Sequence, residues 1–128
     1  MAANGAGGAA RAVLVVDHGS RLASANALLD AVVARVRERL PDRSVGAAHL
    51  ELAAPAIPEA IDAAVAAGAR EIVLAPWFLL PGAHATGDLR RLAQEAERRH
   101  PGVRVACAEP LGLDERIVDV LLARIASA

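Results

Sequence analysis

Short apolar runs alternate with amphipathic stretches along almost the whole chain, and this alternation restricts the possible folds more than any other feature. The runs AVLVV at 12–16 and EIVLAPWFLL at 71–80 are rich in branched aliphatic residues, as is typical of strands buried on both faces. Weaker runs of the same kind occur at 44–52 and 103–108. Each run precedes a stretch with helical spacing of apolar residues. Strands that alternate with helices predict a parallel sheet with helices on both faces.

The stretches between the runs also carry helix boundaries. The first helix is predicted to end before Pro41, and the second to begin at Pro55 or Pro58 and end at Gly68. A third helix is expected from about 86 to 100. The apolar stripe of the last helix is formed by Ile117, Val118, Leu121, Leu122 and Ile125. We therefore predict an α/β fold: a single three-layer domain with a four-stranded parallel sheet of order 2-1-3-4, as in a flavodoxin-like half-domain.

Length, charge and cysteine content limit the class of protein further. A chain of 128 residues fits one domain, with residues 1–10 as a disordered tail and 11–128 as the folded part. The net charge of −1 argues against a nucleic-acid partner. Cys107 is the only cysteine, which favours a reducing compartment. Because we find neither a convincing signal peptide nor an apolar run long enough to span a membrane, we expect a cytoplasmic protein without a membrane partner.

Polar side chains follow three of the predicted strands. His18 lies just after the first, Glu51 at the end of the second, and His84 in the turn after the third. The carboxyl ends of parallel strands share one edge of the sheet, where ligands bind. Imidazole and carboxylate groups bind divalent transition metals, and a site with few protein ligands keeps positions open for transfer or catalysis. This pattern favours a metal site at the edge, although a histidine in such a loop can equally be a solvated residue.

The other two histidines favour structural roles. His49 lies within the second predicted strand, two residues from Glu51 and on the same face of that strand. His100 lies at the end of a predicted helix, where it would complement the helix dipole. Cys107 is interpreted as a small core residue.

Four segments of the chain, in this order, resemble those of one known family. They are VDHGSR at 16–21, AHLELAAPAIPEAI at 48–61, APWFLLPGAHATGDL at 75–89 and PLG at 110–112. Together they make the chain similar to the short CbiX/SirB-type chelatases of the class II tetrapyrrole chelatase family. The resemblance implies insertion of Co²⁺ or Fe²⁺ into sirohydrochlorin, in cobalamin or sirohaem biosynthesis, with Ni²⁺ as a further candidate metal. It implies no prosthetic group, because the metal is a substrate.

The resemblance also implies roles for individual residues. His18 and His84 correspond to the metal ligands of the family, and Glu51 to the associated carboxylate. The short family members act as homodimers. Two departures concern how substrate carboxylates would be held: Ala83 replaces a basic residue, and the segment 87–90 replaces an acidic residue and a proline.

A flat macrocycle edged with carboxylates would need an apolar surface and cations. Candidate substrate-binding residues are Ser20, Arg21, Trp77, Phe78 and Arg90, or Arg91 in place of Arg90. The aromatic rings could pack on the macrocycle and the guanidinium groups could pair with its carboxylates. A core position for each aromatic ring and a solvated position for each arginine are the alternatives.

Two other functions remain as alternatives. Histidine phosphatases carry Arg-His-Gly after their first strand, but Asp17 stands where that arginine would bind phosphate and would repel it. A non-catalytic module that binds or delivers the metal or the tetrapyrrole would use the same ligands as a chelatase. Turnover beyond one equivalent separates binding from catalysis.

Overall fold

A single sheet of four parallel strands organises the chain, in the order β2-β1-β3-β4. The computed structural model describes residues 10–80 and 82–128, so most of the predicted tail lies outside the described residues. The strands are β1 (Arg11–Asp17), β2 (Ser44–His49), β3 (Glu71–Pro76) and β4 (Arg104–Cys107). β1 pairs with β2 and β3, and β3 pairs with β4. The predicted fold class and strand order are confirmed.

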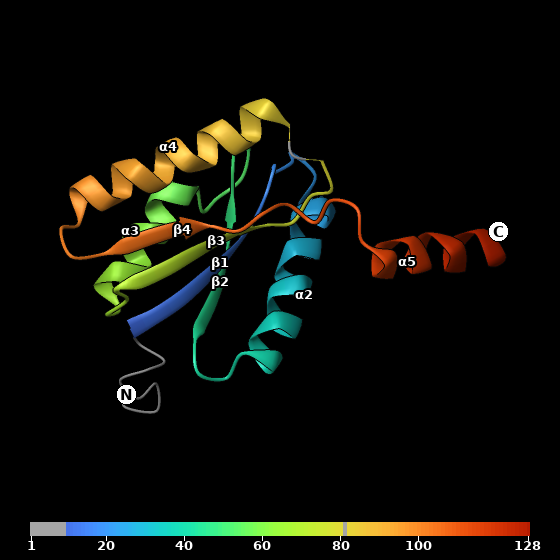
Figure 1. Cartoon of the computed structure of the whole chain (residues 1–128), viewed down its shortest axis with the longest axis horizontal. Helices are drawn as coiled ribbons and strands as arrows, with labels where there is room; N and C mark the ends of the chain where they lie inside the picture. The colour runs from blue at the N-terminus through green and yellow to red at the C-terminus, as the bar shows by residue number, and fades with distance from the viewer. Residues whose placement is uncertain (1–9, 81) are drawn as a thin grey trace.

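Helices cover the two faces of the sheet unequally. α2 (Ala23–Arg39) packs against β1 and β2 on one face, while α3 (Ile57–Ala66) and α4 (Ala83–Arg99) lie on the opposite face (Figure 1). α5 (Glu115–Ala126) projects away from the sheet. No helix of the part of the chain that the structure describes is long and apolar enough to cross a membrane.

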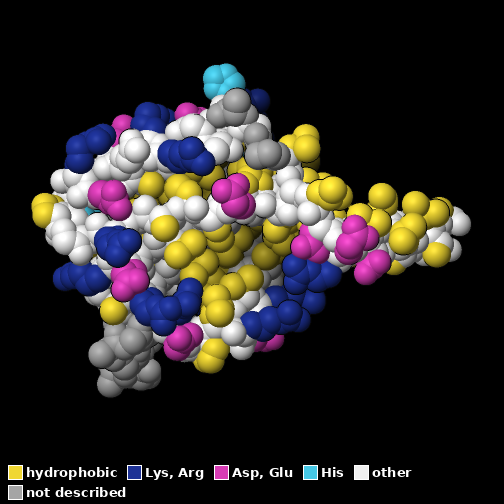
Figure 2. Space-filling view, viewed as in Figure 1, with side chains coloured by type: hydrophobic (Ala, Val, Ile, Leu, Met, Phe, Trp, Pro, Cys, Tyr) yellow, Lys and Arg dark blue, Asp and Glu magenta, His cyan; other side chains and the backbone are white. Residues whose placement is uncertain are grey.

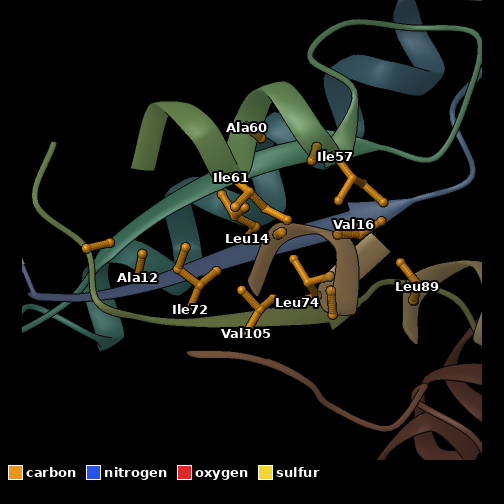
Figure 3. Close-up of a cluster of buried hydrophobic side chains, with 14 of the residues drawn as sticks. Ala12, Leu14, Val16, Ile57, Ala60, Ile61, Ile72, Leu74, Leu89 and Val105 are labelled. Carbon is orange, nitrogen blue, oxygen red and sulfur yellow. The ribbon is translucent and has the colours of Figure 1, made fainter. Parts of the chain in front are cut away.

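Alternation along the strands divides the core into two clusters. Ala12, Leu14 and Val16 of β1 point towards α3 and α4, where side chains such as Ile57 and Ile61 meet them (Figure 3). The intervening residues of β1, Val13 and Val15, pack with Leu29 and Val33 of α2 and with Val45 of β2. Strand β1 is therefore buried on both of its faces, as its sequence predicts.

Two predicted strands are too long. β2 ends at His49 and not at residue 52, and β3 ends at Pro76 and not at residue 80. The chain turns after β2, where Leu52 adopts φ 68°. After β3, the Trp77 amide donates to the Val16 carbonyl, and the following apolar residues leave the sheet. A run of apolar residues predicts burial, but it does not show whether the segment stays in the sheet or continues as a loop.

Two helices also differ from expectation. α4 begins at Ala83, before the predicted start near residue 86, and the Thr86 amide donates to the Gly82 carbonyl in its first turn. α5 forms where it was predicted, but none of its residues is buried. The prediction that helices cover both faces is therefore correct for α2, α3 and α4 and wrong for α5.

Candidate metal site at the carboxyl edge

The loop that carries His18 is fixed by hydrogen bonds to the start of α2. The Ser20 amide donates to Asn26 Oδ1 over 3.0 Å, and Asn26 Nδ2 donates back to the Ser20 carbonyl over 2.7 Å. The Leu22 amide donates to Ser20 Oγ over 3.0 Å. These bonds hold a short loop in which the His18 side chain is exposed at the carboxyl edge.

The His18 ring stacks on the ring of Phe78. Their centroids lie 4.6 Å apart with an interplanar angle of 29°. Phe78 is half-buried and packs against the core beneath the edge, so one face of the imidazole rests on a supported surface. The contact joins the loop after β1 to the segment after β3, which is the neighbouring strand.

Glu51 lies beside the same loop through its backbone. Its amide donates to the His18 carbonyl over 3.0 Å, and the Leu50 amide donates to the Asp17 carbonyl over 2.9 Å. Gly19 has φ +87°, and a Cβ atom there would overlap the carbonyl oxygen of Glu51. Only glycine therefore fits the close approach of the two loops. Glu51 itself is exposed and lies beyond β2, so the idea that it shares a strand face with His49 is wrong.

A polar pair of one buried and one partly buried side chain lies directly behind these loops. His49 is 3% exposed, and its Nδ1 lies 2.6 Å from Asp17 Oδ1. Since Asp17 precedes His18 and His49 precedes the loop of Glu51, the pair ties the ends of β1 and β2 together. The structural interpretation of His49 is consistent with this arrangement.

His84 occupies a different setting from the one predicted. It lies in the first turn of α4 and not in a turn before the helix, and its side chain is exposed. Its helix follows β3, which lies next to β1, so the elements that carry His18 and His84 are neighbours at the carboxyl edge. Within residues 10–80 and 82–128, no three His, Cys, Asp or Glu side chains gather closely enough to hold a metal ion together.

Some of the candidate substrate-binding side chains contact other residues of the protein, and the others are exposed. Ser20 uses its hydroxyl within its own loop, and Phe78 is occupied by His18. Arg21 and Arg90 are exposed. Trp77 is 40% exposed and lies beside Phe78 in an apolar hollow of about 280 Å³. Exposed apolar surface and cations are therefore both present around the edge.

Arg91, the alternative to Arg90, is engaged on α4. Its guanidinium pairs with Asp88 and Glu95 of the same helix, at 3.4 Å and 3.3 Å. These contacts leave Arg90 as the better candidate of the two. Cys107, beneath Arg90, is partly buried, and burial raises the pKa of its thiol, which fits a packing role.

The segment PLG at 110–112 has no role predicted from the sequence. The Leu111 amide donates to the Phe78 carbonyl over 3.1 Å, and the Gly112 amide donates to the Leu79 carbonyl over 2.9 Å. The segment therefore holds the apolar residues after β3 in place once they leave the sheet. The quoted motif was the only signal in the sequence for this pairing.

Two curated proteins are similar to most of the chain. The chain is 36% identical over 118 residues to the chloroplastic sirohydrochlorin ferrochelatase of Arabidopsis thaliana, covering 92% of this chain and 52% of that protein. It is 31% identical over 137 residues to the sirohydrochlorin cobaltochelatase of Methanocaldococcus jannaschii, covering 88% of this chain and 96% of that protein. The chain thus spans about half the length of the plant relative and nearly all of the archaeal one.

A solved structure shares the fold. The sirohydrochlorin chelatase SirB of Bacillus subtilis subspecies spizizenii, in complex with cobalt, superposes with a TM-score of 0.86 at 30% identity. The match covers 92% of this chain and 50% of that one. The family model CbiX matches residues 12–128, which is nearly the whole chain. On this match, supported by the shared fold, the chain belongs to the CbiX family.

Proposed function

We propose that this protein inserts a divalent metal ion, Co²⁺ or Fe²⁺, into a sirohydrochlorin-type tetrapyrrole. The observation that carries the proposal is the exposed His18 imidazole, which stacks on Phe78 at the carboxyl edge, next to the helix that bears His84. The relatives named as sirohydrochlorin ferrochelatase and cobaltochelatase support the same activity.

The reaction exchanges one divalent cation for two pyrrole protons. Neutral imidazole nitrogens of His18 and His84 would hold the metal while its remaining positions stay open to the ring nitrogens. The exposed Glu51 carboxylate, whose backbone is bonded to that of His18, would accept the two protons one after the other and pass each to bulk water. The metal enters and leaves as substrate, so no resident cofactor is proposed.

The remaining groups at the edge suit the substrate. Arg21 and Arg90 would pair with substrate carboxylates, and Trp77 would offer apolar surface to the macrocycle. An edge is open on one side, so a homodimer with facing edges would exclude water from the ring. The proposed location is the cytoplasm, where the single thiol would stay reduced.

Replacing the two candidate ligands tests the proposal. His18→Ala and His84→Ala should each remove most of the insertion rate and leave the fold intact, because both side chains are exposed. His100→Ala is the matched control, since His100 caps the opposite end of α4. The visible spectrum of sirohydrochlorin with Co²⁺, and with Fe²⁺ under anaerobic conditions, measures the rate. A wild-type rate no higher than the protein-free rate with both metals would reject the activity.

The role of Glu51 and the binding alternative need separate measurements. Glu51→Gln should lower the rate less than either histidine variant, because both imidazoles remain. A delivery module would stop after one equivalent of product per chain, whereas a chelatase continues. Product formed at a large excess of metal and tetrapyrrole over protein therefore separates the two functions.

A further inference from the structure

We propose that Asp17 and His49 are positioning residues for metal insertion. Their hydrogen bond fixes the Glu51 loop (residues 50–55) relative to the His18 loop (residues 18–22). The inference rests on the proposed function. It adds two side chains that act through these loops and not by contact with the metal.

His49 is an exception among the polar residues of the protein. Figure 2 shows arginine and acidic side chains spread in mixed groups over the surface in view. Among the residues that the structure describes, His49 is the only polar or charged residue that is buried. Removing an imidazole from water costs free energy unless a hydrogen-bond partner compensates for it. Its place at the base of the candidate site therefore points to a role there.

The partner of His49 is Asp17, directly opposite on the neighbouring strand. The two are the last residues of β2 and β1 and form a register pair in the sheet. Nδ1 of His49 lies 2.6 Å from Oδ1 of Asp17, and the two side chains are 4% and 18% exposed. A short hydrogen bond to a carboxylate is stronger than one between neutral groups, and low exposure to water strengthens it further. The pair therefore holds the two strand ends at a fixed distance.

The two loops lie against each other just beyond the pair. The Glu51 amide donates to the His18 carbonyl over 3.0 Å, which extends the contact of the two strands into the loops. A Cβ atom at Gly19 would lie 3.2 Å from the Cβ atom of His49, so the His18 loop passes directly against this histidine. A displacement of the His49 side chain is therefore passed to both loops.

His49 also closes the base of the Glu51 loop. Its amide donates to the Pro55 carbonyl over 2.9 Å, and it forms an isolated β-bridge with Ala56, the N-cap of α3. Within the described residues, no side-chain hydrogen bond reaches residues 50–56. The position of Glu51 thus depends on backbone bonds and on the His49 side chain at the base of its loop.

The relative position of the two loops matters because insertion uses both of them. His18 would hold the metal while Glu51 takes the protons, so the imidazole and the carboxylate must reach the same macrocycle. Proton transfer needs its base within hydrogen-bonding reach, and a misplacement of about 1 Å can cost about a hundredfold in rate. A looser pair should therefore lower kcat more than it raises KM for the metal, since both candidate imidazole ligands remain.

The hydrogen bond can be removed and then restored. Asp17→Ala removes the acceptor and should lower kcat by about tenfold or more, with KM for Co²⁺ changed by less than about threefold. Asp17→Asn keeps an oxygen acceptor at the same place and should recover most of the lost rate. An Asp17→Ala protein with the wild-type kcat would overturn the proposal. An Asp17→Asn protein as slow as Asp17→Ala would do the same, because charge and not the hydrogen bond would then control the rate.

A double-mutant cycle tests whether Asp17 acts through His49. In a His49→Ala background the bond is already absent, so Asp17→Ala should add little further loss of kcat. If Asp17→Ala causes its full loss in this background as well, Asp17 acts on its own and the positioning role of the pair is wrong.

A control in the other core cluster separates positioning from a general loss of stability. Val33→Ala opens a cavity beyond the middle of α2 and should lower the urea midpoint without lowering kcat. If Val33→Ala is as slow as Asp17→Ala at a similar urea midpoint, the rate follows stability and the proposal fails.

Amide hydrogen exchange gives a readout that does not depend on insertion. The Glu51 amide should exchange faster in Asp17→Ala than in Val33→Ala, because only the first variant loosens its loop. Equal exchange of this amide in the two variants would contradict the positioning role. Absence of insertion by the wild-type protein would instead reject the proposed function, so the two failures can be told apart.

Discussion

At the scale of single residues, His18 is held by its neighbours on two sides. Phe78 stacks on its ring, and the backbone of Glu51 bonds to its carbonyl oxygen. The side chains of His18, Glu51 and His84 all remain exposed. Such an arrangement fixes the backbone of a site while leaving its donor atoms available to a metal ion and a macrocycle.

The buried pair behind the site leads to a prediction of stability. Asp17→Ala removes the carboxylate that bonds to the buried His49, and it should lower the free energy of unfolding by about 1–3 kcal/mol. Asp42→Ala is the control, because Asp42 pairs with Arg11 at the exposed surface and should contribute about 0–1 kcal/mol. Urea denaturation measures both. Equal losses in the two variants would show that the buried bond adds no stability.

Two glycines should respond to alanine in opposite ways. Gly19→Ala forces a side chain against the Glu51 carbonyl at φ +87° and should destabilise the protein by at least about 1 kcal/mol. Gly87→Ala has open space within α4 and should stabilise it by about 0.5–1 kcal/mol. Thermal unfolding gives the sign of each change. Gly19→Ala should also slow metal insertion, since it moves the loop of Glu51; a stable, fully active Gly19→Ala protein would contradict the close approach.

At the scale of elements, one carboxylate in the middle of α3 contacts the C-terminal end of α4. Asp62 of α3 lies 2.7 Å from His100 Nε2 and accepts a hydrogen bond from Arg99 over 2.8 Å. The hydrogen bond with His100, followed by that with Arg99, holds the pKa of the Asp62 carboxyl below its usual range. These bonds complement the apolar contacts that pack the two helices on the sheet.

This shift predicts how stability depends on pH. A carboxyl group whose pKa is lowered by folding stabilises the native state above its unfolded pKa, and the contribution is lost as the pH falls through the folded pKa. Asp62→Asn should therefore be less stable than wild type at about pH 5, with the difference shrinking towards about pH 2. Urea midpoints across this range provide the measurement. A difference that stays constant with pH would show that the charge of Asp62 is not responsible.

At the scale of the whole molecule, the sheet presents an open edge, and the proposed dimer closes it. Insertion requires weakly acidic pyrrole groups to lose protons, which exclusion of water and fixed polar groups would favour. The exposed Leu79 and Leu80, at 50% and 78%, together with Trp77 add apolar surface at this edge. A facing copy would bury such surface.

The dimer can be tested through the activity itself. The insertion rate per chain should be constant at high protein concentration and fall on dilution into the range where light scattering shows monomers. The insertion rate per chain and the mass from light scattering should have the same midpoint concentration, because the same monomer–dimer equilibrium controls both. A monomer that retains the full rate per chain would exclude the facing-edge arrangement.

The sequence by itself determined the strand order and the edge at which the candidate site lies. Buried β-branched runs and helical spacing are local patterns, and the parallel connection follows from their alternation. Strand β1 and the position of His18 at its carboxyl end could thus be predicted without any tertiary information. The same holds for the apolar stripe of α5, which forms where its spacing indicates.

Only the tertiary structure decided how these parts meet. The stacking of Phe78 on His18, the approach of Gly19 to Glu51 and the departure of Trp77 from the sheet depend on contacts between segments far apart in the chain. The exposed stripe of α5 has the same origin. A periodic pattern reports which side of an element is apolar, but the partner of that side is set by where the rest of the backbone lies.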